Sequence, residues 1–136
     1  MTPEDADALA AERYVSLTTY RRTGAAVSTP VWIVGLEDGR VGFWTAMGTG
    51  KTQRLAHDPR VVLRPCDARG RVAPGAPSYD GTAELVRSGA AFTEVQAEVR
   101  EKYGLMTTVT RLLSRLGRQG RRRLTYADTV VLVTLE

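Results

Sequence analysis

The chain has 136 residues, 43% of them hydrophobic and 25% charged, and a formal net charge of +4 at pH 7. This length suits one domain, and the composition is that of a folded protein rather than a disordered or fibrous one, so we expect a single domain over residues 1–136. One cysteine, Cys66, and one histidine, His57, are too few for an internal disulfide or for a tetrahedral metal site supplied by this chain alone.

Two further features bear on where the protein works. No apolar stretch approaches the roughly 20 residues that a membrane-spanning helix needs. The acidic start, Met1 to Asp7, has neither the cationic flank nor the apolar core of a signal peptide. We therefore expect a cytoplasmic protein without a membrane span.

The N-terminal third predicts a helix followed by antiparallel strands. Thr2 is a hydroxyl N-cap, and Pro3 and the acids after it suit the first turn of a helix that continues to about Ala11. Runs of β-branched and aromatic residues then predict strands at Tyr14–Tyr20, Ala25–Val34 and Val41–Thr45. Turn residues around Gly24 and Gly39 separate these runs, which predicts two hairpins.

The rest of the chain adds short helices and three more strands. A glycine-bearing bend opens a short helix near Gly50, and Pro59 must end it. Beyond it we expect strands Val61–Cys66, Tyr79–Val86 and Thr129–Leu135, a loop Asp67–Pro77, and helices Ala90–Tyr103 and Leu105–Leu116. The last strand is almost wholly apolar, which predicts a central place in the sheet. Six strands with short helices in this order indicate a mainly β (α+β) fold, a small β-barrel with helical decoration.

The strongest candidate site is the segment Gly48 to Arg54. Its glycines permit close approach of a ligand to the backbone, and a helix start leaves amide groups unpaired. Lys51 and Arg54, three residues apart, project from one side of that helix. This combination suits a phosphate group. The alternative is an amphipathic turn whose cations face water.

The same segment invites comparison with the nucleotide-binding P-loop. That motif requires a glycine where Thr45 stands, so the pattern is incomplete. A P-loop also belongs between a buried parallel strand and a long helix, whereas antiparallel hairpins precede a short helix here. We therefore do not expect an NTPase.

Side chains for protein-based catalysis are scarce, and we assign no catalytic residue. His57 falls on the predicted short helix. We expect it to be a surface residue rather than a general base. Cys66 ends an apolar strand and is expected to be a small buried hydrophobe rather than a nucleophile. Trp32 and Trp44 have two possible roles: contact with the planar ring of a ligand, or packing in the core or in an interface. If the protein is an enzyme, an organic cofactor carries its reaction.

Several segments together resemble a known family. The matching residues are Arg22–Trp32, Gly42–Thr45, Gly50–Leu55 and Asp58–Val61. They are similar to the flavin and deazaflavin split β-barrel proteins related to pyridoxamine 5′-phosphate oxidase. Further matches at Pro65–Gly70, Gly81–Ala83 and Lys102–Leu105 point to the branch of F420-dependent oxidoreductases. The Thr-Pro-Val-Trp and Lys-x-x-Arg elements are specific only in combination.

The resemblance implies a fold, a cofactor and a site. The fold is a six-stranded antiparallel split β-barrel of the FMN-binding type, forming a homodimer whose partner chain completes each cofactor groove. The implied function is an F420H2-dependent reductase that transfers a hydride from reduced coenzyme F420 to a small organic acceptor, with FMN as the alternative cofactor and haem as a less favoured one. The implied cofactor-binding residues are Val31, Trp32, Thr45, Ala46, Met47, Gly50, Lys51 and Arg54.

A different class of function rests on the arginine-rich segment 111–123. Seven basic residues and no acid lie between Lys102 and Ala127, whereas the rest of the chain has 12 basic and 15 acidic residues. Such a segment is able to bind nucleic acid or an anionic membrane. It lacks the interleaved aromatics of single-strand binders, so a solvated helix face is the simpler interpretation and we expect no nucleic-acid partner. Its last arginines, Arg121 to Arg123, are candidates to meet the polyglutamate tail of the deazaflavin.

Overall fold

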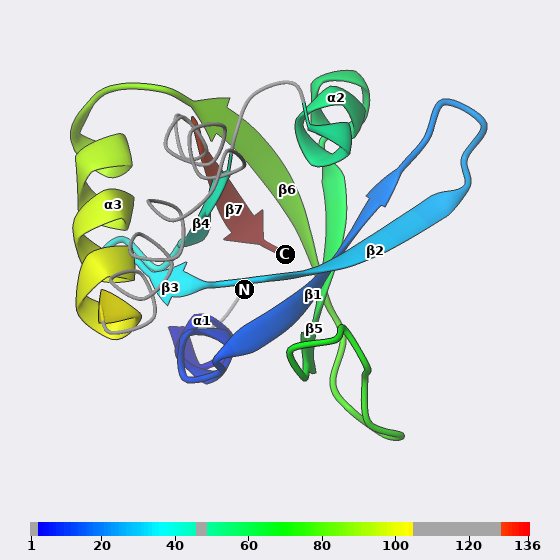
Figure 1. Ribbon diagram of the computed structural model, residues 1–136, viewed down its shortest axis with the longest axis horizontal. Helices are drawn as coiled ribbons and strands as arrows, with labels where there is room; N and C mark the ends of the chain where they lie inside the picture. Colours follow the sequence, from blue (N-terminus) through cyan, green and yellow to red (C-terminus); the bar gives the residue numbers. More distant parts are fainter. Residues whose placement is uncertain (1–2, 46–48, 105–128) are drawn as a thin grey trace, which may run out of the picture.

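The computed structural model describes residues 3–45, 49–104 and 129–136, which form one antiparallel sheet and three helices (Figure 1). The elements are α1 Pro3–Ala10, β1 Tyr14–Tyr20, β2 Ala26–Val31, β3 Val34–Gly35, β4 Val41–Thr45, α2 Gly50–His57, β5 Arg60–Cys66, β6 Tyr79–Val86, α3 Ala90–Lys102 and β7 Thr129–Leu135. The strands pair in the order β2-β1-β5-β6-β7-β4-β3. This α+β split half-barrel confirms the predicted fold class. The expected helix Leu105–Leu116 lies outside the described residues.

The predicted place of the last strand is confirmed. β7 lies between β6 and β4 and pairs with both along its length. Six of its seven residues are buried, because both faces are covered. The second of these faces packs against α3, and Gly42 on β4 makes that approach possible: a Cβ there would come within 2.8 Å of a methyl carbon of Val95.

The predicted single strand Ala25–Val34 is wrong in one respect, because the structure divides it. β2 pairs with β1 up to Val31, and β3 pairs with β4 from Val34. The two residues between them, Trp32 and Ile33, carry the chain from one edge of the sheet to the other. One continuous run therefore supplies both edges, which gives seven strands in the described residues where six were expected.

The main-chain groups of Ile33 lie at this junction, where neither β1 nor β4 pairs with them. The end of α3 satisfies them. The Ile33 N–H donates to the Tyr103 hydroxyl at 3.1 Å, and the Lys102 ammonium donates to the Ile33 carbonyl at 2.6 Å. The Tyr103 hydroxyl donates in turn to the Arg13 carbonyl at 2.8 Å. Burial raises the pKa of Tyr103 to about 12, so this hydroxyl keeps its proton.

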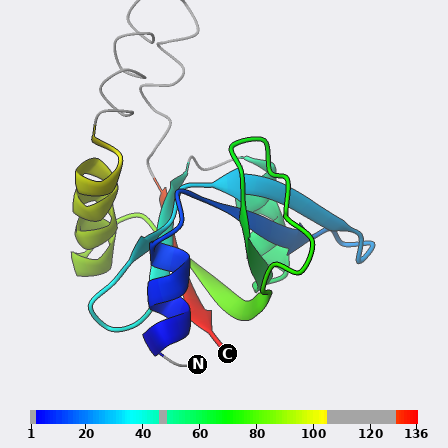
Figure 2. The ribbon, with the colours of Figure 1, turned by 90° about the horizontal axis from the view of Figure 1, so that it is seen from below.

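Apolar side chains gather in two clusters on the two faces of the curved sheet. The larger cluster fills the barrel interior and includes Leu17, Phe43 and Leu63, all fully buried. The smaller one lies under α3 and includes Val95, Val99 and Tyr103. Figures 1 and 2 show α3 and α2 on opposite sides of the molecule, with α2 beside the hairpin of β1 and β2. The sheet thus separates a face covered by α3 from the end covered by α2.

The Tyr103→Phe substitution tests the junction. It leaves the buried Ile33 N–H without an acceptor, so we expect the free energy of unfolding to fall by about 1 to 3 kcal/mol, measured by urea denaturation. Tyr79→Phe is the matched control, because Tyr79 is a partly buried tyrosine whose hydroxyl makes no hydrogen bond within the described residues. The control is expected to change stability by less than about 0.5 kcal/mol. Equal effects of the two substitutions would contradict a role of the hydroxyl.

Candidate functional site

A cavity of about 300 Å³ lies between α2 and the turn that joins β1 to β2. Its lining residues come from the end of β1, the turn after it and α2, and are Tyr20, Arg21, Arg22, Gly50, Gln53, Arg54 and His57. Three of the seven are arginines, and none carries a carboxylate. A cavity with this lining attracts anions.

The start of α2 leaves donors near this cavity. Thr49 is the N-cap, and its hydroxyl accepts from the Thr52 N–H at 3.4 Å. The first turn of the helix contains no acidic side chain, so nothing there neutralises the positive end of the helix dipole. A Cβ on Gly50 would come within 2.7 Å of the Arg54 guanidinium. Glycine at this position therefore lets Arg54 fold back over the helix start.

Arg54 is held by the barrel rather than by an acid. Its Nε donates to the hydroxyl of Thr19, a fully buried residue of β1. Burial, and then the charge of Arg21, lower the pKa of Arg54. Both guanidinium groups line the cavity, where their like charges are unfavourable.

Lys51 is half-buried and adds to this concentration of charge. Burial, and then the charge of Arg54, lower its pKa. No ion pair joins Lys51 or Arg54 to an acid within the described part of the chain. Like charges brought together without a counter-charge are unfavourable, and a bound anion would relieve that cost. Lys51 itself does not line the cavity; it follows Gly50, which does.

The remaining predicted site residues lie elsewhere. Val31 is buried in the barrel interior, and Trp32 is half-buried and stacks on Tyr103 under α3. Thr45 ends β4 and is 1% exposed, and its hydroxyl has no hydrogen-bond partner among the residues that the structure describes. Ala46 and Met47 lie outside the described residues. The structure thus gathers Gly50, Lys51 and Arg54 and leaves the others apart.

The strand β2 connects these two regions. Its first residue, Ala26, pairs with Tyr20 at the cavity, and its last, Val31, pairs with Val15 at the far end. Five residue steps along a strand span about 17 Å. A ligand that touches both the cavity and the neighbourhood of Trp32 must therefore be long and narrow.

Two functional candidates were missed from the sequence. From the sequence Arg21 has no assigned role, and Arg22 has a place only in a turn and in a segment that resembles the family, yet the hairpin brings both to α2. A pair of arginines in a turn was the one available signal, and it does not indicate which element the turn will face. His57 is exposed as predicted and also lines the cavity.

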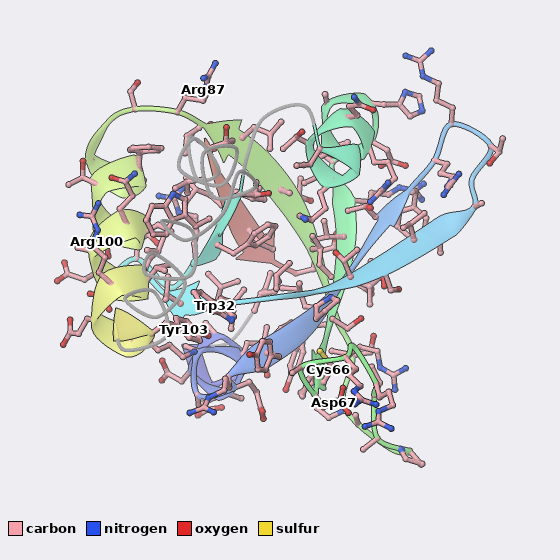
Figure 3. All side chains as sticks on the ribbon, viewed as in Figure 1. Trp32, Cys66, Asp67, Arg87, Arg100 and Tyr103 are labelled. Carbon is pink, nitrogen blue, oxygen red and sulfur yellow. The ribbon has the colours of Figure 1, made fainter. Side chains whose placement is uncertain are left out.

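Cys66 differs from its prediction, because it is half-buried rather than buried. It ends β5, at the opposite end of the molecule from α2 (Figure 3). Burial and the nearby Asp67 raise the pKa of its thiol, which disfavours the nucleophilic thiolate. Within residues 3–45, 49–104 and 129–136, no group of three or more metal-binding side chains occurs, and no helix has the length and apolar character needed to cross a membrane.

Comparisons with known proteins agree with this fold. The family model described as pyridoxamine 5′-phosphate oxidase matches residues 1–133. The conserved hypothetical protein Rv2991 from Mycobacterium tuberculosis is 22% identical with a TM-score of 0.66, over 98% of this chain and 79% of that one. HupZ from Group A Streptococcus is 14% identical with a TM-score of 0.65, over 100% and 90% of the two chains.

A third structure, described as an F420 reductase, is 15% identical with a TM-score of 0.59, over 96% of this chain and 92% of that one. At such identities the likeness concerns the fold alone. A search of curated protein sequences found no match.

The lowered pKa of Lys51 gives the site a testable pH dependence. Because Lys51 loses its proton below the ordinary lysine value of 10.5, we expect affinity for an anion to fall with rising pH earlier than for a normal lysine. The probe is phenyl phosphate, titrated calorimetrically from about pH 7.5 to 10, since phosphomonoesters have a second pKa of about 6 and keep a constant charge there. In the Lys51→Arg variant the new guanidinium does not titrate in this range, so the affinity of the variant for phenyl phosphate should not change with pH. A parallel decline in both proteins would assign the titration to another group.

Proposed function

Since this chain belongs to the pyridoxamine 5′-phosphate oxidase family, we propose that it is an oxidoreductase that binds reduced coenzyme F420 and transfers a hydride from it to a small organic acceptor. The observation that carries the proposal is the cavity at α2, with three arginines and no carboxylate in its wall. Such a wall suits the phosphorylated part of the coenzyme. The proposal includes a single domain over residues 1–136 that forms a cytoplasmic homodimer.

The phosphate end of the coenzyme is assigned to the cavity. Arg54 already has its Nε bonded to Thr19, which orients the rest of the guanidinium before any ligand arrives. Lys51, which follows Gly50 on α2, and the N–H groups at the start of that helix are further donors beside the cavity. Arg21 and Arg22 reach the same cavity from the hairpin.

The tricyclic ring is assigned to the far end of β2. Trp32 offers a half-buried aromatic surface there, and Val31 contributes the adjacent backbone. Thr45 has a buried hydroxyl without a partner, which is available to a polar ring atom. The span of about 17 Å along β2 suits a planar ring joined to a phosphate by an extended chain.

The proposed reaction requires no catalytic acid or base among the protein's own side chains. When bound, reduced coenzyme F420 supplies a hydride. The hydride would carry both electrons to an electrophilic carbon of the acceptor, and a proton from water would complete the product. The chain has to hold the coenzyme at both ends and keep water from the face where transfer occurs. A site built from Trp32, Thr45 and a cationic cavity, without a catalytic acid, is sufficient for that task.

FMN is the nearest alternative cofactor. The additional arginines at the hairpin turn would serve its compact phosphate as well as they serve the phosphodiester of F420. Two observations favour the deazaflavin: the sequence resemblance at Lys102–Leu105, and a similar fold in a protein described as an F420 reductase. The arginine-rich segment 111–123, a candidate for contact with the polyglutamate tail, lies outside the described residues.

A side-by-side titration tests the cofactor. Purified apo protein is mixed with reduced F420, FMN and haem, and binding is followed by coenzyme fluorescence, flavin absorption and the haem Soret band. We expect F420 to bind with one coenzyme per chain and to support reduction of an activated alkene. Tight binding of FMN alone would change the assignment to a flavoprotein. Binding of haem alone would remove the reductase and direct attention to His57.

The Arg54→Ala substitution tests the cavity. Loss of a charge-assisted, bidentate contact to phosphate is expected to weaken coenzyme affinity about 10- to 100-fold in fluorescence titration. Arg40→Ala is the matched control. It removes the same charge from a partly exposed ion pair with Asp38 in the turn between β3 and β4. Similar affinities of the two variants would place the phosphate outside the cavity.

A further inference from the structure

The two aromatic rings of Trp32 and Tyr103 stack in parallel, with centroids 4.5 Å apart and planes 5° from one another. Tyr103 is 3% exposed, whereas Trp32 is only half-buried. Figure 3 shows the pair beside the end of α3. One face of the indole therefore rests on a buried tyrosine, while Trp32 as a residue stays partly exposed.

The backbone beside Trp32 is held from the same place. Tyr103 and Lys102 bond both the N–H and the carbonyl of Ile33, the residue that follows Trp32. The Lys102 ammonium also binds the carbonyl oxygens of Ala10 and Glu12, each at 2.6 Å. Two consecutive residues at the end of α3 thus hold the ring of Trp32 and the main chain of the residue that follows it.

We propose that Tyr103 is a positioning residue for the coenzyme ring, because it sets the plane of the Trp32 indole against which that ring packs. This inference rests on the proposed function. A half-buried tryptophan would otherwise lose rotamer freedom when a ligand binds, and stacking in advance removes that cost. A parallel pair also presents a flat surface, which suits a planar tricyclic ring.

An ordinary core residue would not have these features. A leucine at position 103 would fill a comparable apolar space under α3. It would have no flat ring to orient the indole of Trp32 and no hydroxyl to bond Ile33. Val99 represents the ordinary case: it is fully buried on α3 in the same cluster, and its side chain has neither a ring nor a hydroxyl. The role assigned to Tyr103 acts on the ring end of the coenzyme and leaves the cation-lined cavity at α2 untouched.

The test compares Tyr103→Leu, Tyr103→Phe and Val99→Ala with the wild type. For Tyr103→Leu we expect coenzyme affinity to fall about three- to tenfold and hydride transfer to slow, while affinity for phenyl phosphate is unchanged. Tyr103→Phe keeps the ring and is expected to bind coenzyme within about twofold of wild type despite its lower stability. Val99→Ala is expected to lose stability and to keep both affinities.

Fluorescence supplies a readout that a merely structural role would not move. In a Trp44→Phe background Trp32 is the only tryptophan. Adding Tyr103→Leu is expected to increase acrylamide quenching and lower the anisotropy of Trp32, whereas adding Val99→Ala should change neither. If Tyr103→Leu does not fold, Tyr103→Met keeps apolar contact without a plane and serves the same comparison.

Three outcomes would overturn the inference. They are unchanged coenzyme affinity in Tyr103→Leu, equal loss of coenzyme and phenyl phosphate affinity, and a loss in Val99→Ala of the same size. Failure of the proposed function is distinguishable, because the wild type itself would then bind no coenzyme. The fluorescence comparison would still show whether Tyr103 orients Trp32.

Discussion

The structure depends on how the peptide groups of Ile33 are satisfied. One run of chain forms both edges of the sheet, pairing with β1 before Trp32 and with β4 after Ile33. A buried N–H and carbonyl at such a junction cost about 1 to 3 kcal/mol each if left unpaired. The end of α3 supplies the hydrogen-bond partners. Tyr103 and Lys102 bond the N–H and the carbonyl of Ile33, and Lys102 also bonds the last residue of α1, Ala10.

A second constraint concerns charge. The packing of α2 on β1 brings Arg54 to Thr19, and the hairpin turn after β1 brings Arg21 to the same cavity. Nothing in the described residues neutralises this group, and burial, followed by the like charges, lowers the pKa values of Lys51 and Arg54. Hydrophobic packing of α2 holds the cations together against their repulsion. Structural roles alone give no reason for such an arrangement, whereas an anionic ligand does.

Local features could be predicted from the sequence and long-range ones could not. The strand Tyr79–Val86 and the helix stopped before Pro59 follow from periodicity and from proline, which act over a few residues. The neighbourhood of Lys51 and Arg54 follows from helical spacing. The break at Trp32 and the arrival of Arg21 at α2 depend on which distant elements pair or face each other. A single sequence holds no local signal for either, because an unbroken strand and an isolated turn satisfy the same pattern.

These constraints meet along β2. The strand is paired with β1 over its whole length, so its two ends are held at a fixed separation. At one end lie the cations of the α2 cavity, and at the other lies Trp32, stacked on Tyr103. A ligand that engages both ends is located along its length by the strand and in its plane by the aromatic pair. The proposed hydride transfer is sensitive to small errors in both respects, and a rigid strand between two anchoring groups supplies by geometry the positioning that such a reaction needs.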